Sequence, residues 1–92
     1  MSLEAIFWKV EKPDHIKYNI QLTGSTKKEM LAAASELRDW NLMMSKYDHS
    51  ERLDTKILSK DFESEEGWQN FERSLSFPLQ EISFKFRRIR SV

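Results

Sequence analysis

The sequence predicts a small α+β fold in which two helices cover one face of an antiparallel sheet. Residues 26–40 carry a helix start signal, followed by apolar residues at three- and four-residue steps. Short segments on both sides of this helix alternate apolar and polar residues, as half-buried strands do. The 92 residues include two glycines and two prolines, with no internal repeat and no low-complexity segment. We therefore expect one domain over residues 1–92 without an internal linker.

Two strands are expected before the helix. Residues 5–11 (AIFWKVE) form the first, with two alternate sets of side chains: Ile6, Trp8 and Val10 on one side, Phe7 and Lys9 on the other. Residues 12–15 form a turn, because proline fixes φ and aspartate can bond its own backbone. Residues 17–22 (KYNIQL) form the second strand, with three inward side chains: Tyr18, Ile20 and Leu22.

The central helix is expected over residues 27–40. Thr26 and Glu29 have the spacing of a capping box, in which a hydroxyl and a carboxyl each bond the other's backbone N–H. The apolar residues that follow share one helical face: Met30, Ala33, Ala34, Leu37 and Trp40. A helix with a single apolar face predicts a sheet beneath it.

Three strands and a second helix are expected after it. Residues 41–47 and 53–60 form a strand pair joined by a polar connection. Ser64 is placed to cap a helix over residues 65–76, which carries Trp68, Phe71 and Leu75 on one face. The last strand runs from Gln80 to about Arg88, with inward side chains Ile82, Phe84 and Phe86.

Without its first strand this order is βαββαβ, the pattern of ferredoxin-like folds, here with an extra N-terminal strand. Residues 20–24 (IQLTG) enter the helix, and residues 37–42 (LRDWNL) leave it. In these two stretches the chain resembles ACT-type regulatory domains. The resemblance implies a domain that holds a small ligand, such as an amino acid, at the loop that enters the helix, in a dimer interface.

Composition excludes several classes of protein. Lys plus Arg and Asp plus Glu number 15 each, so a zero net charge argues against a general polyanion binder. The absence of cysteine excludes disulfides, thiol catalysis and Cys-ligated zinc, and fits a cytoplasmic location. No apolar run reaches the ~20 residues of a membrane span, so no membrane insertion is expected. Residues 1–3 (MSL) have the look of an expression scar, in which case the native chain begins near Glu4 within something larger.

Most reactive residue types have simple structural explanations. Asp48, His49 and Ser50 are neighbours and cannot orient one another in series, so a turn explains them better than a hydrolase triad. No metal-ligand spacing accompanies His15 or His49, and we expect neither a metal nor another cofactor. The acidic residues 63, 65 and 66 fit a helix start. The tryptophans at 8, 40 and 68 are expected in the core.

Two stretches are candidate binding sites. The glycine and hydroxyls of Gly24, Ser25 and Thr26 precede the helix, where free N–H groups attract a small anion or an amino acid carboxylate. A simple strand-to-helix turn is the alternative explanation. Near the C-terminus, the cations Lys85, Arg87, Arg88 and Arg90 could bind nucleic acid, although an edge strand protected by charge explains them more simply.

The sequence therefore predicts a non-enzymatic regulatory or protein-interaction domain. A homodimer is expected, because Phe7 and Leu58 lie on the parity opposite to the main apolar set of their strands and would leave the open sheet face partly apolar. Two other functions stay open: a nucleic-acid-binding protein that uses the basic terminal strand, and a small ferredoxin-like enzyme with a cavity between sheet and helix. No acid–base constellation in the sequence supports the enzyme.

Overall fold

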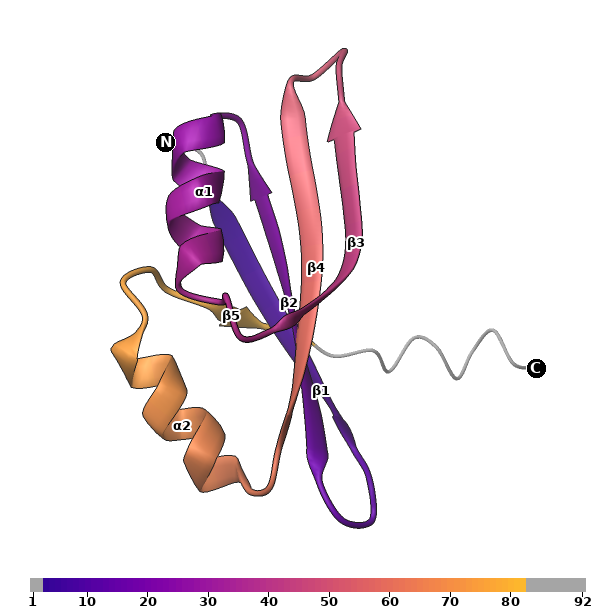
Figure 1. Cartoon of the computed structure of the whole chain (residues 1–92), viewed down its shortest axis with the longest axis vertical. Coiled ribbons are helices and arrows are strands. Elements are labelled where there is room, and N and C mark those ends of the chain that lie inside the picture. Colours follow the sequence, from indigo (N-terminus) through magenta and orange to yellow (C-terminus); the bar gives the residue numbers. More distant parts are fainter. Residues whose placement is uncertain (1–2, 83–92) are drawn as a thin grey trace, which may run out of the picture.

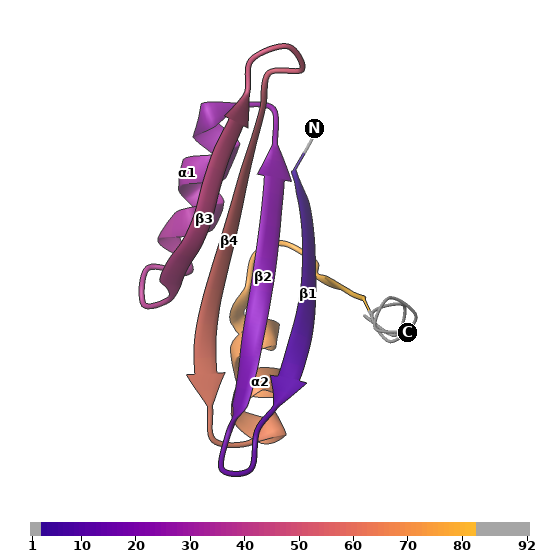
Figure 2. The ribbon, with the colours of Figure 1, turned by 90° about the vertical axis from the view of Figure 1, so that its right-hand side faces the viewer.

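The computed structural model describes residues 3–82 (Figure 1). Its elements in chain order are β1 (Glu4–Glu11), β2 (Ile16–Gly24), α1 (Lys27–Ser35), β3 (Asn41–Asp48), β4 (Leu53–Phe62), α2 (Glu65–Ser74) and β5 (Gln80–Glu81). The strands form one sheet, and both helices lie on the same face of it (Figure 2). The α+β class is therefore confirmed.

The ferredoxin-like strand order is wrong for this chain. The sheet order is β3-β4-β2-β1-β5, whereas the ferredoxin-like order would place the last strand beside β2. A tight turn, in which the Lys12 N–H donates to the His15 carbonyl at 2.8 Å, folds β1 back onto β2 along its whole length. Because β1 occupies that edge of β2, β5 pairs with β1 instead, and it does so in parallel. The sheet is therefore mixed, not antiparallel throughout.

The last predicted strand can be followed only in part. β5 is described over Gln80–Glu81, and the Ile82 N–H donates to the Phe7 carbonyl at 3.0 Å. Glu81 pairs with Phe7, which lies on the helix side of the sheet, so Ile82 lies on the other side and its predicted inward position is wrong. Phe84 and Phe86, which were also predicted to point inward, lie outside the described residues. So do the four candidate nucleic-acid contacts, Lys85, Arg87, Arg88 and Arg90.

Both helix starts are confirmed, but both helices end earlier than predicted. Thr26 Oγ1 accepts from the Glu29 N–H at 3.3 Å, and Ser64 Oγ accepts from the Gly67 N–H at 3.4 Å. α1 ends at Ser35, whose hydroxyl donates to the Ala32 carbonyl at 2.7 Å. Tight turns, in which backbone hydrogen bonds join residues three positions apart, then lead to Trp40. α2 ends at Ser74, not at residue 76.

The side chains of β1 face the opposite way from the prediction. Phe7 and Leu58 both pair with Ile20, which points toward the helices, and all three are buried. Directly paired residues share a face. Ile6, Trp8 and Val10 consequently lie on the other side, the open face, which no helix covers in residues 3–82.

Two corrections follow from this reversal. Trp8 is not a core residue, although Trp40 and Trp68 are. The apolar residues of the open face include Ile6, Trp8, Val10 and Ile57, and not Phe7 and Leu58.

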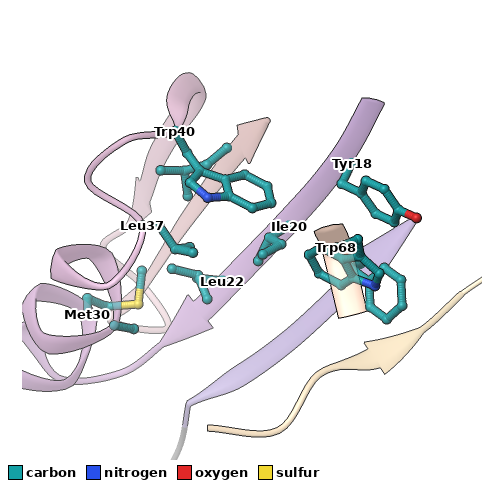
Figure 3. Close-up of a cluster of buried hydrophobic side chains, with 10 residues drawn as sticks. Tyr18, Ile20, Leu22, Met30, Leu37, Trp40 and Trp68 are labelled. Atoms are coloured by element: carbon teal, nitrogen blue, oxygen red, sulfur yellow. The ribbon is translucent and has the colours of Figure 1, made fainter. Parts of the chain in front are cut away.

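The core has an aliphatic half under α1 and an aromatic half under α2 (Figure 3). Met30 and Leu37 pack with Leu22 in the first half. In the second half the Tyr18 and Trp68 rings stack with centroids 4.4 Å apart and planes 11° apart. The predicted inward set of β2, Tyr18, Ile20 and Leu22, is completely buried.

Candidate functional site

The start of α1 and the β3–β4 hairpin enclose a cavity with a volume of about 450 Å³, which we call the α1 cleft. In Figure 1 the hairpin rises beside this end of the helix. Gly24, Ser25 and Thr26 line the cleft together with Lys27. The other wall consists of five residues from the hairpin: Ser45, Tyr47, Arg52, Asp54 and Lys56. The three residues predicted from the sequence are thus brought together with six that were not predicted.

The hairpin residues face the cleft because of the strand register. Lys56 pairs with Leu22 and with Ser45, while Asp54 pairs with Gly24 and with Tyr47. Leu22 points toward the helices, and alternate residues of a strand share a face. The sequence shows that Asp54, Lys56 and Leu58 occupy alternate positions and so share one face of the strand. Only the strand pairing shows that this face borders the start of α1.

The cleft carries a net positive charge. Three cationic side chains, Lys27, Arg52 and Lys56, are set against one carboxylate, that of Asp54. Lys56 Nζ lies 3.4 Å from Asp54 Oδ2 and donates to Ser45 Oγ at 3.1 Å, so this ammonium is held within the cleft. The positive end of the helix dipole adds to the same field.

The structure gives a reason for glycine at position 24 that the sequence did not reveal. It is the last residue of β2 and its φ is not positive. A Cβ at this position would come within 2.9 Å of Met30 Sδ, in the core under α1. The absence of a Cβ at this position therefore leaves room for the Met30 side chain. A substitution at Gly24 would displace that side chain, so its effect on ligand binding could not be separated from its effect on packing.

Thr26 acts as the helix cap, while the second half of the expected capping box is not formed. Its hydroxyl accepts from the Glu29 N–H, and the buried Glu29 Oε1 has no hydrogen-bond partner among the described residues. The N–H groups of the first helical turn have no partner within the helix, and the Thr26 hydroxyl satisfies one of them. The remaining N–H groups are suited to an anion in the cleft.

The Asp48-His49-Ser50 stretch forms a turn and not a triad. Ser50 donates its hydroxyl and its N–H to Asp48 Oδ1 at 2.7 and 3.0 Å. These two hydrogen bonds, with the hydroxyl first, lower the pKa of the Asp48 carboxyl. The His49 ring instead packs edge-on against Tyr47 at 4.7 Å. A serine bonded directly to the aspartate leaves the histidine without a place between them.

No metal centre is found in residues 3–82, where no group of three His, Asp or Glu side chains could hold a metal ion. His15 Nδ1 lies 2.7 Å from Asp14 Oδ1, and its Nε2 lies 3.6 Å from Asp61 Oδ1.

In the same described part of the chain, no helix is long and apolar enough to cross a membrane.

The edge strand β3 borders the cleft and is exposed along its whole length. Four of its large side chains are between 38% and 59% exposed: Leu42, Met43, Met44 and Tyr47. β3 pairs with β4 on one side, and it ends the sheet on the other. A long, apolar edge of this kind is a template for pairing with another strand.

Comparisons of the chain with family models, with curated proteins and with solved structures found no match. Function is therefore inferred from the geometry of this chain itself.

Proposed function

We propose that this chain is a non-enzymatic regulatory domain that binds a small anion in the α1 cleft, such as a phosphate group or the carboxylate of an amino acid. One observation supports this above all: three cations and the start of α1 meet at a single cavity of about 450 Å³. That volume lies within the range of about 300–1,000 Å³ for small-molecule sites. The resemblance to ACT-type domains suggested a ligand at the same loop.

We further propose that the domain is a homodimer joined through β3. Its exposed apolar side chains give the edge a reason to be covered. Ser45 and Tyr47 belong to β3 and also line the cleft. Ligand binding in the cleft would therefore act directly on the pairing strand, as a regulatory domain requires.

The test is titration of the protein with inorganic phosphate and with a panel of amino acids, followed by thermal shift. At a hundredfold excess over Kd, a ligand of the folded state adds about 2.7 kcal/mol to the free energy of unfolding. Lys27→Gln is the test variant and Lys28→Gln the matched control, because both exposed lysines begin α1 and only Lys27 lines the cleft. Lys27→Gln should weaken binding about two- to fivefold. The proposal fails if no ligand raises the midpoint, or if the two variants respond alike.

A further inference from the structure

A second cavity lies under α2, away from the α1 cleft, and we call it the α2 pocket. Its volume is about 290 Å³. One part of its lining is apolar and includes the rings of Phe7, Tyr18 and Trp68. The rest is polar and comes from β1, α2 and β5. The α1 cleft and the α2 pocket share no lining residue.

The Tyr18 hydroxyl is a buried polar group without a hydrogen-bond partner among residues 3–82. The residue is 0% exposed, and its ring is fixed by the stack on Trp68. Figure 3 shows the hydroxyl at the end of the ring away from Leu37 and Trp40. It interacts electrostatically with Lys9, Glu65, Glu11 and Glu81, and all of these except Glu11 line the pocket. An unpaired buried hydroxyl costs free energy, so this one calls for a partner.

The charges around the pocket favour a cation as that partner. Lys9 Nζ donates to Glu65 Oε2 at 2.6 Å, so these two charges neutralise each other. Glu72 and Glu81 also line the pocket, and neither has an ion-pair partner in the described part of the chain. Aromatic faces add partial negative charge, which attracts ammonium groups. Burial raises the pKa of Tyr18, so the phenol stays neutral and can accept a hydrogen bond.

From this geometry we propose that the α2 pocket is a second binding site, and that it takes a small organic ammonium ion. The ammonium would donate to the Tyr18 hydroxyl and pair with the carboxylates of Glu72 and Glu81. The apolar body of the ligand would lie against Trp68 and Leu79. A cavity of about 290 Å³ lies just below the usual range for ligand sites, which restricts the ligand to a small molecule. This site does not depend on the anion proposed for the α1 cleft.

The probe is benzylamine, which is a cation at neutral pH, with benzyl alcohol and benzoate as neutral and anionic controls of similar size. The full chain, labelled with ¹⁵N, is titrated with each and followed by amide chemical shifts. Benzylamine should give saturable shifts in α2 and in β1. Benzyl alcohol should bind about tenfold more weakly, because it lacks the charge, and benzoate should give no saturable shift.

Three variants test the roles of the named groups. Tyr18→Phe removes the hydroxyl alone and should weaken benzylamine binding about two- to tenfold. Glu72→Gln should weaken it about two- to fivefold, whereas Glu66→Gln, on the same helix but outside the pocket, should leave it unchanged. Midpoints of thermal unfolding measured in parallel separate lost affinity from lost folding.

Several results would overturn the site. Equal shifts with the amine and the alcohol would show that charge is not recognised. Unchanged affinity in Tyr18→Phe, with the fold intact, would mean that the hydroxyl is satisfied by water alone. Shifts that never saturate would show that the amine has no specific site. Shifts that centre on the α1 cleft would place its site there and not in the α2 pocket.

Discussion

Tyr18 couples a well-packed ring to a hydroxyl that has no partner in residues 3–82. Because removal of an unsatisfied buried hydroxyl relieves its desolvation, Tyr18→Phe should be neutral or raise the free energy of unfolding by about 1 kcal/mol without ligand. Urea denaturation measures this difference. Tyr47→Phe is the control, since that ring is half exposed and its change should stay within about 0.5 kcal/mol. A loss of stability in Tyr18→Phe would mean that the hydroxyl has a partner.

The same residue predicts a dependence on alkaline pH. Burial raises the pKa of Tyr18 in the folded state above its ordinary value of 10.0. Below that value the phenol is neutral in both the folded and the unfolded state, so its ionisation takes nothing from the free energy of unfolding. As the pH rises further, the unfolded state loses the proton first, and the folded state loses stability. The decline above about pH 10 should be shallower in Tyr18→Phe.

Part of this loss of stability at alkaline pH should remain in Tyr18→Phe, because Lys9 also contributes to it. Its hydrogen bond to Glu65 raises the pKa of the ammonium, so the contribution of this ion pair is also lost as the pH rises. Denaturation midpoints of both proteins across the alkaline range give the comparison. Parallel curves for wild type and Tyr18→Phe would contradict the assignment to Tyr18.

At the site itself, the sequence located Gly24 but not its purpose. A glycine before a helix start is typical of anion-binding loops, and Gly24 does line the α1 cleft. The contact that explains it is with Met30, six residues later, and depends on how closely α1 packs on the sheet. Local pattern could predict a close approach at this glycine, but not which group approaches.

At the scale of the element, two leucines near the end of α1 show that burial and helix formation are separate properties. Leu37 lies beyond the end of α1 and is 1% exposed, whereas Leu31 lies within the helix and is 60% exposed. Leu37→Ala should cost about 2–5 kcal/mol, because it leaves a cavity in the core. Leu31→Ala should change stability by less than about 0.5 kcal/mol. Urea denaturation of both variants checks this, and similar losses would show that helix formation, not burial, decides their contributions.

Strand β1 shows where pattern stops being informative. Its segment AIFWKVE has apolar residues on both faces, so alternation alone could not choose between them. The larger set, Ile6, Trp8 and Val10, was expected inside, but pairing with β2 places Phe7 and Lys9 on the helix face. β2 was predicted correctly because its outward residues are all polar.

At the scale of the whole molecule, neighbours distant in sequence decide most of what was not predicted. The insertion of β1 between β2 and β5 follows from a hairpin and could not be derived from the order of elements alone. The cations of the α1 cleft come from α1, β4 and the turn before it, and only the sheet brings them together. Local signals such as Thr26 and Ser64 needed no such information, and both caps were predicted correctly.

The proposed dimer has a specific strand register. Beyond the bulge between Leu42 and Met44, side chains of β3 alternate, with Ser45 and Tyr47 on the helix face and Lys46 on the open face. Two antiparallel copies that continue one sheet must pair residues of the same face, so the twofold axis lies midway between two copies of the same residue. An axis at Lys46 would oppose two ammonium groups. An axis at Ser45 instead pairs Met44 with the partner's Lys46, and we expect this register.

Because the chain has no cysteine, a single introduced thiol can test that register. In Ser45→Cys the two thiols would face each other across the axis, at a Cα separation of about 4.5–5.5 Å that a disulfide can span. In Lys46→Cys, the matched control, the two thiols are diagonal neighbours about 7–8 Å apart, beyond the usual reach. Mild oxidation should therefore link Ser45→Cys rapidly and Lys46→Cys slowly, with light scattering of the unmodified chain showing a dimer at micromolar concentration. Rapid linking of Lys46→Cys alone would shift the axis by one residue, whereas a monomer that links at neither position would exclude pairing through β3.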